Sequence, residues 1–409
     1  MKLEVLKKYA KLAVVKGSNV QKGQLLVISA PVEAYEFTRL CVEEAYNAGA
    51  GEVIVDYNDS LLTRLKYKNV EKERLGLVPD YFVEKRKYYV DEKACFLHIV
   101  SEVPGNLKGI DSDKIQTAQI AYMKAIKPYR YYTMSSIGQW SIVAYPNLVW
   151  AKKVFPELSD EEAYDKLFEA ILFASRIDEN DPIKNWDQHN SEIAKHTKLM
   201  NDYNFKSLHF TNELKTDLTV DLAINHIWEG GMDKTPSKVE FNANMPTEEV
   251  FSMPKRDSVN GIVYASKPLS YQGNLIEDFY LKFENGKVVD YDAKEGKDSL
   301  TNLLNTDEGS RYLGEVALIS YDSPISNLNL LFYNTLFDEN ASCHLALGAA
   351  YPSNLKGGVD LNEEELVEHG ANVSMNHCDF MFGSREMKIV GTTFDNKEVV
   401  LFEHGNFVV

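Results

Sequence analysis

Gln24-Leu-Leu-Val-Ile-Ser29 and Glu52-Val-Ile-Val-Asp56, with a helical pattern over 32–48 between them, decide the fold of the N-terminal part. Two apolar runs joined by a helix within roughly thirty residues are typical of a β-α-β unit with parallel strands. A third apolar run, Ala94-Cys-Phe-Leu-His-Ile-Val100, extends the expected sheet. The first turn, Ser29-Ala-Pro-Val-Glu33, lacks the glycine-rich sequence that binds a dinucleotide. We therefore predict a parallel α/β sheet that serves as a scaffold.

The pattern changes beyond residue 205 to short strands separated by turns. Residues 206–210 and 217–223 alternate apolar and polar side chains, as half-buried antiparallel strands do. Asn285-Gly286 is a strong hairpin turn, and Asp395-Asn396 marks a second hairpin near the end of the chain. The second part is therefore predicted to be β-rich and mainly antiparallel, with helices between the strands.

The chain has 409 residues, more than one hydrophobic core usually supports, so we expect two domains. Helical patterns over 160–174 and 182–203 separate the two kinds of sheet. We predict an N-terminal α/β domain at 1–155 and a C-terminal β-rich α+β domain at 156–409, with the boundary between 105 and 205.

The net charge of −17 and the lack of a basic run argue against a nucleic-acid partner. No apolar run approaches the ~18 to 20 residues of a membrane span, and the N-terminal sequence has no apolar core typical of a signal peptide. Cys41, Cys95, Cys343 and Cys378 show no paired spacing. A reduced, cytoplasmic protein is the simplest expectation.

Acidic and histidine residues gather in four segments of the second part. The segments are Asn244-Met-Pro-Thr-Glu-Glu-Val250, Gly314-Glu-Val-Ala-Leu-Ile319, Glu339 with His344 and Tyr351, and His377-Cys-Asp379. Carboxylates and imidazoles are ligands of Zn²⁺, Co²⁺, Mn²⁺ or Mg²⁺, and this set is large enough for two ions. Taken singly, Glu249 could be a helix-start acid, Glu315 a strand-end acid facing water, and either histidine a hydrogen-bonded core residue.

The sequence gives weaker evidence that other polar residues bind metal or take part in catalysis. Cys343 and Cys378 adjoin the two histidines, but in a strand the neighbour of a ligand points the opposite way, so we interpret both as packing residues. Sequence adjacency also does not give the facing geometry that a cysteine nucleophile and its histidine need. His189 and His196 lie one heptad apart on a predicted helix, where solvated or capping roles are commoner than metal binding.

Five separated motifs stand in a characteristic order along the chain. They are Asn244-Met-Pro-Thr-Glu-Glu-Val-Phe251, Gly314-Glu-Val-Ala-Leu318, Leu336-Phe-Asp-Glu-Asn-Ala-Ser-Cys-His344, Ala350-Tyr351 and His377-Cys-Asp-Phe-Met-Phe-Gly383. Together they resemble the motifs of the aminopeptidase T and aminopeptidase S family of metallopeptidases. The N-terminal half matches in outline as well, through Gln139-Trp140, Ala144-Tyr-Pro146 and Trp150-Ala-Lys-Lys-Val-Phe-Pro156.

The resemblance implies two divalent metal ions per subunit. The residues at the family's metal-binding positions are Glu249, Glu315, Glu339, His344, His377 and Asp379. Glu315 falls at the position of a bridging ligand, whereas Glu339 could instead orient a histidine. Tyr351 falls at the position of the catalytic tyrosine, and either Glu249 or Glu315 could carry the proton.

The expected function is therefore a metal-dependent aminopeptidase that acts on peptides with a free N-terminus, and the resemblance also implies a homodimer. Two other functions stay open: a metal-dependent amidohydrolase that acts on small amides, and a non-catalytic α/β binding protein. Neither the preferred N-terminal residue nor the physiological metal follows from the sequence.

Overall fold

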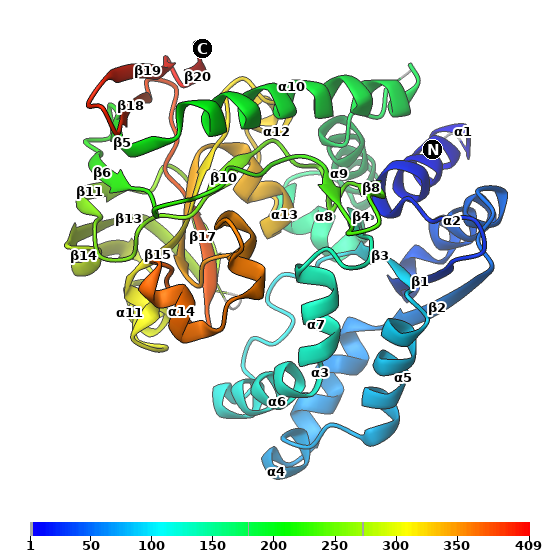
Figure 1. The fold of residues 1–409 in the computed structure, drawn as a ribbon. Coiled ribbons are helices and arrows are strands. Elements are labelled where there is room, and N and C mark those ends of the chain that lie inside the picture. The colour runs from blue at the N-terminus through cyan, green and yellow to red at the C-terminus, as the bar shows by residue number, and fades with distance from the viewer. Residues whose placement is uncertain (1–2, 179, 272–273) are drawn as a thin grey trace. The chain divides into compact units, whose positions relative to one another are not determined.

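The computed structural model describes residues 3–178, 180–271 and 274–409, which divide into two compact units. The first unit comprises the described residues up to Gln188 together with Met232–Pro246, and the second comprises His189–Gly231 and Thr247–Val409 (Figure 1). The chain thus passes between the units three times. The domain boundary at 155 stays a prediction.

A five-stranded parallel sheet forms the centre of the first unit, and the predicted α/β class is confirmed. Its order is β2-β1-β3-β4-β9. The strands are β1 Leu25–Pro31, β2 Glu52–Asn58, β3 Cys95–Val100, β4 Trp140–Ala144 and β9 Asn244–Met245. Strand β9 pairs in parallel with β4, which explains why Met232–Pro246 returns to this unit.

Helices precede, join and follow the strands of this unit. They are α1 Leu3–Leu12, α2 Tyr35–Asn47, α3 Ser60–Asn69, α4 Lys72–Leu75, α5 Asp80–Asp91, α6 Ser112–Ala125, α7 Lys127–Met134, α8 Leu148–Val154, α9 Asp160–Ala174 and α10 Pro182–Tyr203, the last of which continues into the second unit. Val27 of β1 packs in one core with Tyr89 of α5 and Tyr132 of α7. Tyr9 of α1 donates a hydrogen bond to the carbonyl oxygen of Ala144 in β4 (2.7 Å). Strands β1 and β3 are buried along most of their length, as their continuous apolar runs predict.

Two antiparallel sheets form the second unit, as the alternating patterns predict. The larger has the order β12-β13-β11-β6-β5-β18-β19-β20, with β14 paired to β13, and the smaller has the order β10-β15-β16-β17. The larger sheet contains β5 Phe205–Thr211, β6 Asp217–Asp221, β11 Asn260–Tyr264, β12 Leu269–Tyr271, β13 Asn274–Glu284, β14 Lys287–Glu295, β18 Lys388–Thr393, β19 Glu398–Glu403 and β20 Asn406–Phe407. Asn285-Gly286 joins β13 to β14, and Asp395-Asn396 lies between β18 and β19, so both predicted hairpins are confirmed.

The smaller sheet contains β10 Val250–Ser252, β15 Leu313–Leu318, β16 His344–Gly348 and β17 His377–Met381. Its strands turn alternate side chains, such as Val316 and Phe380, into the core of the unit. There the Phe380 ring lies 5.7 Å from the ring of Phe279 on β13. One face of the smaller sheet is thus packed against the larger sheet, and the other face is left for polar residues.

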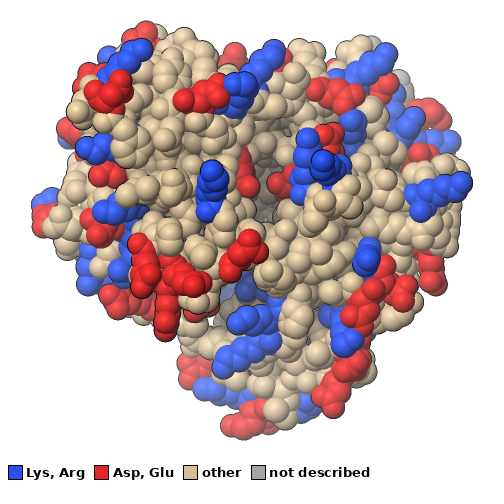
Figure 2. All heavy atoms as spheres, viewed as in Figure 1, with Lys and Arg blue, Asp and Glu red and all other residues tan. Residues whose placement is uncertain are grey.

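Charged side chains of both signs are interspersed over the face shown in Figure 2. Acidic side chains gather there over α14, Glu363–Glu368, whose first turn contains three consecutive glutamates. Within the described ranges, no helix combines the length and the apolar character needed to cross a membrane.

Candidate metal centre

Four of the predicted ligands lie on one face of the smaller sheet because of its register: Glu315, His344, His377 and Asp379. In the antiparallel pairs, Ala317 lies opposite His344, Glu315 opposite Ala346, Ala346 opposite Asp379, and Gly348 opposite His377. Residues directly opposite each other in such pairs project from the same side of the sheet. The acids and histidines therefore share a face, and the small residues between them leave space above the sheet.

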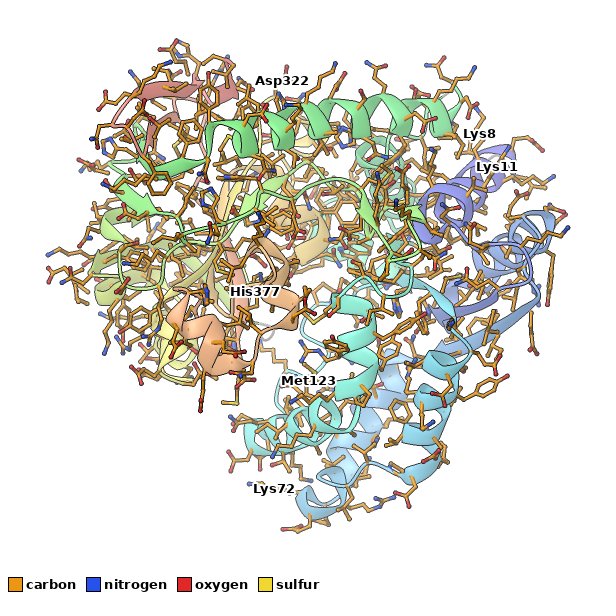
Figure 3. All side chains as sticks on the ribbon, in the orientation of Figure 1. Lys8, Lys11, Lys72, Met123, Asp322 and His377 are labelled. Atoms are coloured by element: carbon orange, nitrogen blue, oxygen red, sulfur yellow. The ribbon has the colours of Figure 1, made fainter. Side chains whose placement is uncertain are left out.

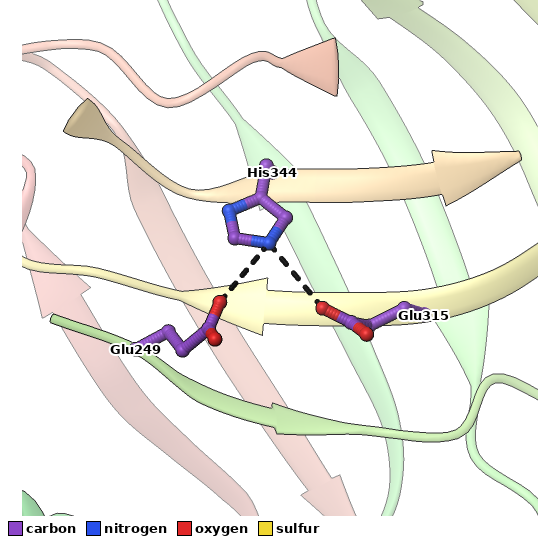
Figure 4. A group of neighbouring side chains, drawn as sticks. All are labelled: Glu249, Glu315 and His344. Atoms are coloured by element: carbon purple, nitrogen blue, oxygen red, sulfur yellow. Dashed lines mark hydrogen bonds and ion pairs between the residues drawn. The ribbon is translucent and has the colours of Figure 1, made fainter. Parts of the chain in front are cut away.

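The first group of ligand atoms is centred on His344. Its Nε2 atom lies 3.2 Å from Oε2 of Glu249 and 3.3 Å from Oε1 of Glu315 (Figure 4). Its Nδ1 atom lies 2.8 Å from the backbone carbonyl oxygen of Glu339. Because a carbonyl oxygen only accepts, Nδ1 is the donor, and in the neutral ring Nε2 keeps a lone pair for a metal ion.

The second group is centred on His377, which Figure 3 labels on β17. Its Nε2 atom lies 3.6 Å from Oε2 of Glu315 and 3.4 Å from Oδ1 of Asp379. Its Nδ1 atom donates to the carbonyl oxygen of Ala349 (2.7 Å), so the same tautomer is fixed as in His344. Each group brings its ligand atoms within 4.8 Å of one another, and Glu315 belongs to both, with one carboxylate oxygen facing each histidine.

Glu339 lies outside both groups but beside them. Burial, followed by the charges of Asp379 and Glu249, raises the pKa of the Glu339 carboxyl well above its ordinary value. Its backbone carbonyl holds His344, so this residue orients a histidine whether or not its carboxylate also binds an ion.

Tyr351 lies at the edge of the centre, with its ring centroid 4.7 Å from that of His377. Burial, together with the nearby charges of Glu315 and Asp379, raises the pKa of the Tyr351 hydroxyl well above its ordinary value. The phenol therefore stays protonated near neutral pH and is available as a hydrogen-bond donor.

The electrostatics of the centre fit divalent cations. Four carboxylates are gathered with the two histidines: those of Glu249, Glu315, Glu339 and Asp379. Burial lowers the pKa of His377, but the charges of Asp379 and Glu315 outweigh this effect and raise the pKa to about 10. Ions bound in the centre would displace the histidine protons, and the four carboxylates, once ionised, would then balance the positive charge of two divalent ions. The buried Oδ1 atom of Asp379 lies 3.4 Å from Nε2 of His377 and, among the described residues, makes no well-formed hydrogen bond, so its lone pairs suit a cation.

The two adjacent acids of the first motif have different surroundings. Glu249 faces His344, whereas Oε2 of Glu248 lies 3.9 Å from Nε2 of His189. That nitrogen also lies 2.7 Å from the carbonyl oxygen of Thr247. Both acids lie in the first motif, the resemblance placed only Glu249 at a ligand position, and Glu249 is the one that lies in a ligand group.

The other residues considered from the sequence lie away from the ligand atoms. His196 stacks on Phe407, with the ring centroids 4.1 Å apart. The thiol of Cys343 donates to the carbonyl oxygen of Ile319 (3.3 Å). Cys343 belongs to the hydrophobic core, and Cys378 packs against that core. Both cysteines are therefore packing residues, as expected.

Asn340 is a supporting residue that sequence reasoning did not identify. Its Oδ1 atom accepts a hydrogen bond from the backbone NH of Glu248 (2.8 Å), and its Nδ2 atom donates to the carbonyl oxygen of Leu336 (3.0 Å). The fully buried Asn340 amide thus ties the segment of Glu249 to the turn that contains Glu339. Asn340 lies within the third motif, which runs from Leu336 to His344. Its hydrogen-bond partners are known only from the structure.

Known proteins of similar sequence and fold point to one family. Residues 3–407 match the family model described as thermophilic metalloprotease (M29). The chain is 46% identical to aminopeptidase AmpS of Bacillus subtilis over 402 residues, with 98% of each chain covered. It is 44% identical to aminopeptidase 2 of Geobacillus stearothermophilus, covering 98% of this chain and 97% of that one. The solved structure of wild-type AmpT from Thermus thermophilus superposes with a TM-score of 0.93 at 39% identity, and all of both chains is covered.

The resemblance seen in the five motifs is confirmed by these matches, as is the expectation of an enzyme of the hydrolase class. The chain belongs to the thermophilic metalloprotease (M29) family.

Proposed function

We propose that this protein is a metal-dependent aminopeptidase that removes the N-terminal residue of peptides by means of water activated between two divalent ions. The observation that supports it best is the placement of Glu315, whose two carboxylate oxygens face His344 and His377 separately. A carboxylate shared in this way suits a bridging ligand. The family match and the relatives named aminopeptidases support the peptidase reaction.

In the proposed centre, Glu249 and His344 would hold one ion, His377 and Asp379 would hold the other, and Glu315 would serve both. Such ions, when bound, polarise the scissile carbonyl and lower the pKa of water. Glu339 supports His344 through its backbone carbonyl and adds negative charge beside the ions.

The side chains of this chain supply the proton transfers and the stabilisation of the oxyanion. The protonated Tyr351 hydroxyl is suited to donate a hydrogen bond to the oxyanion that forms at the scissile carbonyl. Glu249 or Glu315 takes a proton from the attacking water and passes it to the departing amine.

We further propose that the protein acts as a cytoplasmic homodimer and uses Zn²⁺, Co²⁺, Mn²⁺ or Mg²⁺. Carboxylate and imidazole ligands accept all of these ions. The four cysteines are free of disulfides, which suits a reducing compartment.

The test is hydrolysis of leucine and arginine chromogenic amides by the purified protein with added Co²⁺, Zn²⁺ or Mn²⁺. We expect release of the chromophore, its loss in EDTA, and its recovery when the metal is restored. N-acetylated leucine amide is the control, because an aminopeptidase leaves it intact whereas an amidohydrolase of acylated amides cleaves it. Full activity after exhaustive chelation would refute the proposal.

A further inference from the structure

The turn that follows Tyr351 is bound to a segment more than a hundred residues earlier. Tyr351 precedes the 3₁₀ turn η5, Pro352–Asn354, and no side-chain cap holds the start of that turn. The backbone NH of Ile227 donates to the carbonyl oxygen of Asn354 (2.7 Å), and the NH of Lys356 donates to that of Asn225 (3.0 Å). The position of Tyr351 therefore depends on the segment 225–229.

The same segment is paired with the strand next to Glu249. The NH of Glu229 donates to the carbonyl oxygen of Phe251 (3.0 Å), and the NH of Phe251 donates to that of Glu229 (2.9 Å). Two residues that exchange both hydrogen bonds in an antiparallel pair project from the same side. Phe251 lies two residues beyond Glu249, so the side chains of Glu229, Phe251 and Glu249 share a face.

The side chain of Glu229 joins the turn to this strand. Its Oε2 atom accepts a hydrogen bond from Nδ2 of the fully buried Asn354 (3.1 Å). Burial raises the pKa of the Glu229 carboxyl, and a hydrogen bond with Ser353 opposes that rise. The Phe251 ring lies edge-on to the Tyr351 ring, with centroids 6.1 Å apart. Glu229 thus binds two residues of the turn while its backbone neighbour packs against the tyrosine.

We propose that Glu229 is a positioning residue for the hydrolysis: it holds the turn 352–354 so that the Tyr351 hydroxyl keeps its place beside the centre. This role rests on the proposed aminopeptidase function. A carboxylate suits it because one oxygen accepts from Asn354 while the group still binds Ser353. The backbone hydrogen bonds of Asn354 and Lys356 keep the turn folded without it, so Glu229 controls the orientation of Tyr351 rather than the fold.

The experiment compares Glu229→Ala and Glu229→Gln with the wild-type enzyme at saturating Co²⁺. We expect Glu229→Ala to lower kcat about tenfold with KM within about twofold, since removing a buried hydrogen-bond partner has an effect of this order. Glu229→Gln keeps an acceptor for Asn354, and the Ser353 hydroxyl can rotate to accept from its amide, so kcat should recover to near the wild-type value. A glutamine variant as slow as the alanine variant would overturn the proposal, because the charge itself would then be required.

A double-mutant cycle with Tyr351→Phe tests whether Glu229 acts through the tyrosine. If it does, Glu229→Ala causes no further loss of kcat in the Tyr351→Phe enzyme. Additive losses would overturn the proposal. Ser353→Ala gives a second route should Glu229→Ala fail to fold: it removes one partner of the carboxylate and should show a smaller loss of the same non-additive kind.

Glu213→Ala is the matched control, because it also removes a hydrogen bond between a serine and a glutamate (Ser384 Oγ to Glu213 Oε2, 2.7 Å), away from Tyr351. Its kcat should equal that of the wild type. Failure of this inference can be told apart from failure of the proposed function: an inactive wild-type protein refutes the aminopeptidase, whereas an active wild type with an unchanged Glu229→Ala variant refutes only the positioning role.

Discussion

At the scale of single residues, the Tyr351 hydroxyl is the group whose removal best tests the chemistry. Tyr351→Phe keeps the ring that packs on His377 and Phe251, and loses only the donor. Loss of one oxyanion donor typically costs about 2.7 to 4 kcal/mol, so we expect kcat to fall about 10²- to 10³-fold with little change in KM. Steady-state kinetics at saturating metal measure this change.

Tyr280→Phe is the control for that prediction, since the Tyr280 hydroxyl donates to Asp290 at the surface (3.0 Å). It should retain full activity. A Tyr351→Phe enzyme within about threefold of wild type would show that the hydroxyl does not stabilise the transition state.

The family resemblance selected Glu249 rather than Glu248 as a ligand, but the chemistry of the residues alone does not distinguish the two acids. Glu248 and Glu249 have the same side chain. The pairing of β10 with β15 decides which of them faces His344. The two histidines donate hydrogen bonds to backbone carbonyl oxygens. Because every residue has such a carbonyl group, the sequence does not predict which ones are used. The metal-binding roles themselves stay a prediction.

At the scale of elements, Gly348 is the last residue of β16, and its lack of a side chain lets the strand lie close to the segment that contains His377. Gly348 has a φ of +115°, and a Cβ atom there would lie 2.3 Å from the carbonyl oxygen of Asn376. Gly348→Ala must therefore displace the strand that contains His377. We expect a loss of stability of about 1 to 3 kcal/mol and weaker metal retention, measured by thermal denaturation and by elemental analysis after dialysis.

Gly357→Ala separates backbone strain from this clash, because Gly357 has a φ of +77° and no atom within 4 Å of the added Cβ. It should lose some stability but retain its metal. If both variants bind metal as the wild type does, the close approach at Gly348 does not control the position of His377.

His98 on β3 gives the first unit a dependence on pH. Burial, assisted by the charge of Arg86, lowers the pKa of His98 to about 4, and its Nε2 atom lies 3.3 Å from the Tyr129 hydroxyl. The unfolded chain, with an ordinary histidine pKa of about 6.5, binds the proton more readily than the folded one. The stabilising contribution is therefore complete above pH 6.5 and decreases as the pH falls from about 6.5 to about 4.

The loss across that range is at most about 3 kcal/mol. Urea denaturation at several pH values should show a steeper fall of stability with acid for the wild type than for His98→Gln. Parallel curves for the two proteins would contradict the assignment.

Local patterns predicted the longer elements well, since β1, β2, α9 and both hairpins lie where apolar periodicity and turn residues placed them. The short strands β9 and β10 could not be predicted in the same way. Each has two or three residues, and each exists because of a partner far away in the chain: β4 for the former and β15 for the latter. Pairing between a short strand and a distant one leaves no periodic pattern in the local sequence.

At the scale of the whole molecule, the chain passes back and forth between two units whose stability depends on different interactions. The first has apolar strands that pack against helices, and the second gathers four carboxylates beside one face of a sheet. Like charges buried together destabilise a fold unless cations compensate them. The second unit is therefore the part whose stability should depend on metal.

Removal of metal tests this dependence. Ions present at a hundred times their dissociation constant stabilise a native state by about 2.7 kcal/mol, so EDTA should lower the Tm and added Zn²⁺ or Co²⁺ should restore it. Hydrogen–deuterium exchange should show faster exchange in β15, β16 and β17 after chelation, with β1 and β3 unchanged. The Asp379→Asn variant, which removes one of the gathered charges, should show a smaller difference between the chelated and the metal-loaded states. Equal loss of protection in both units would mean that the ions stabilise the molecule elsewhere than at these carboxylates.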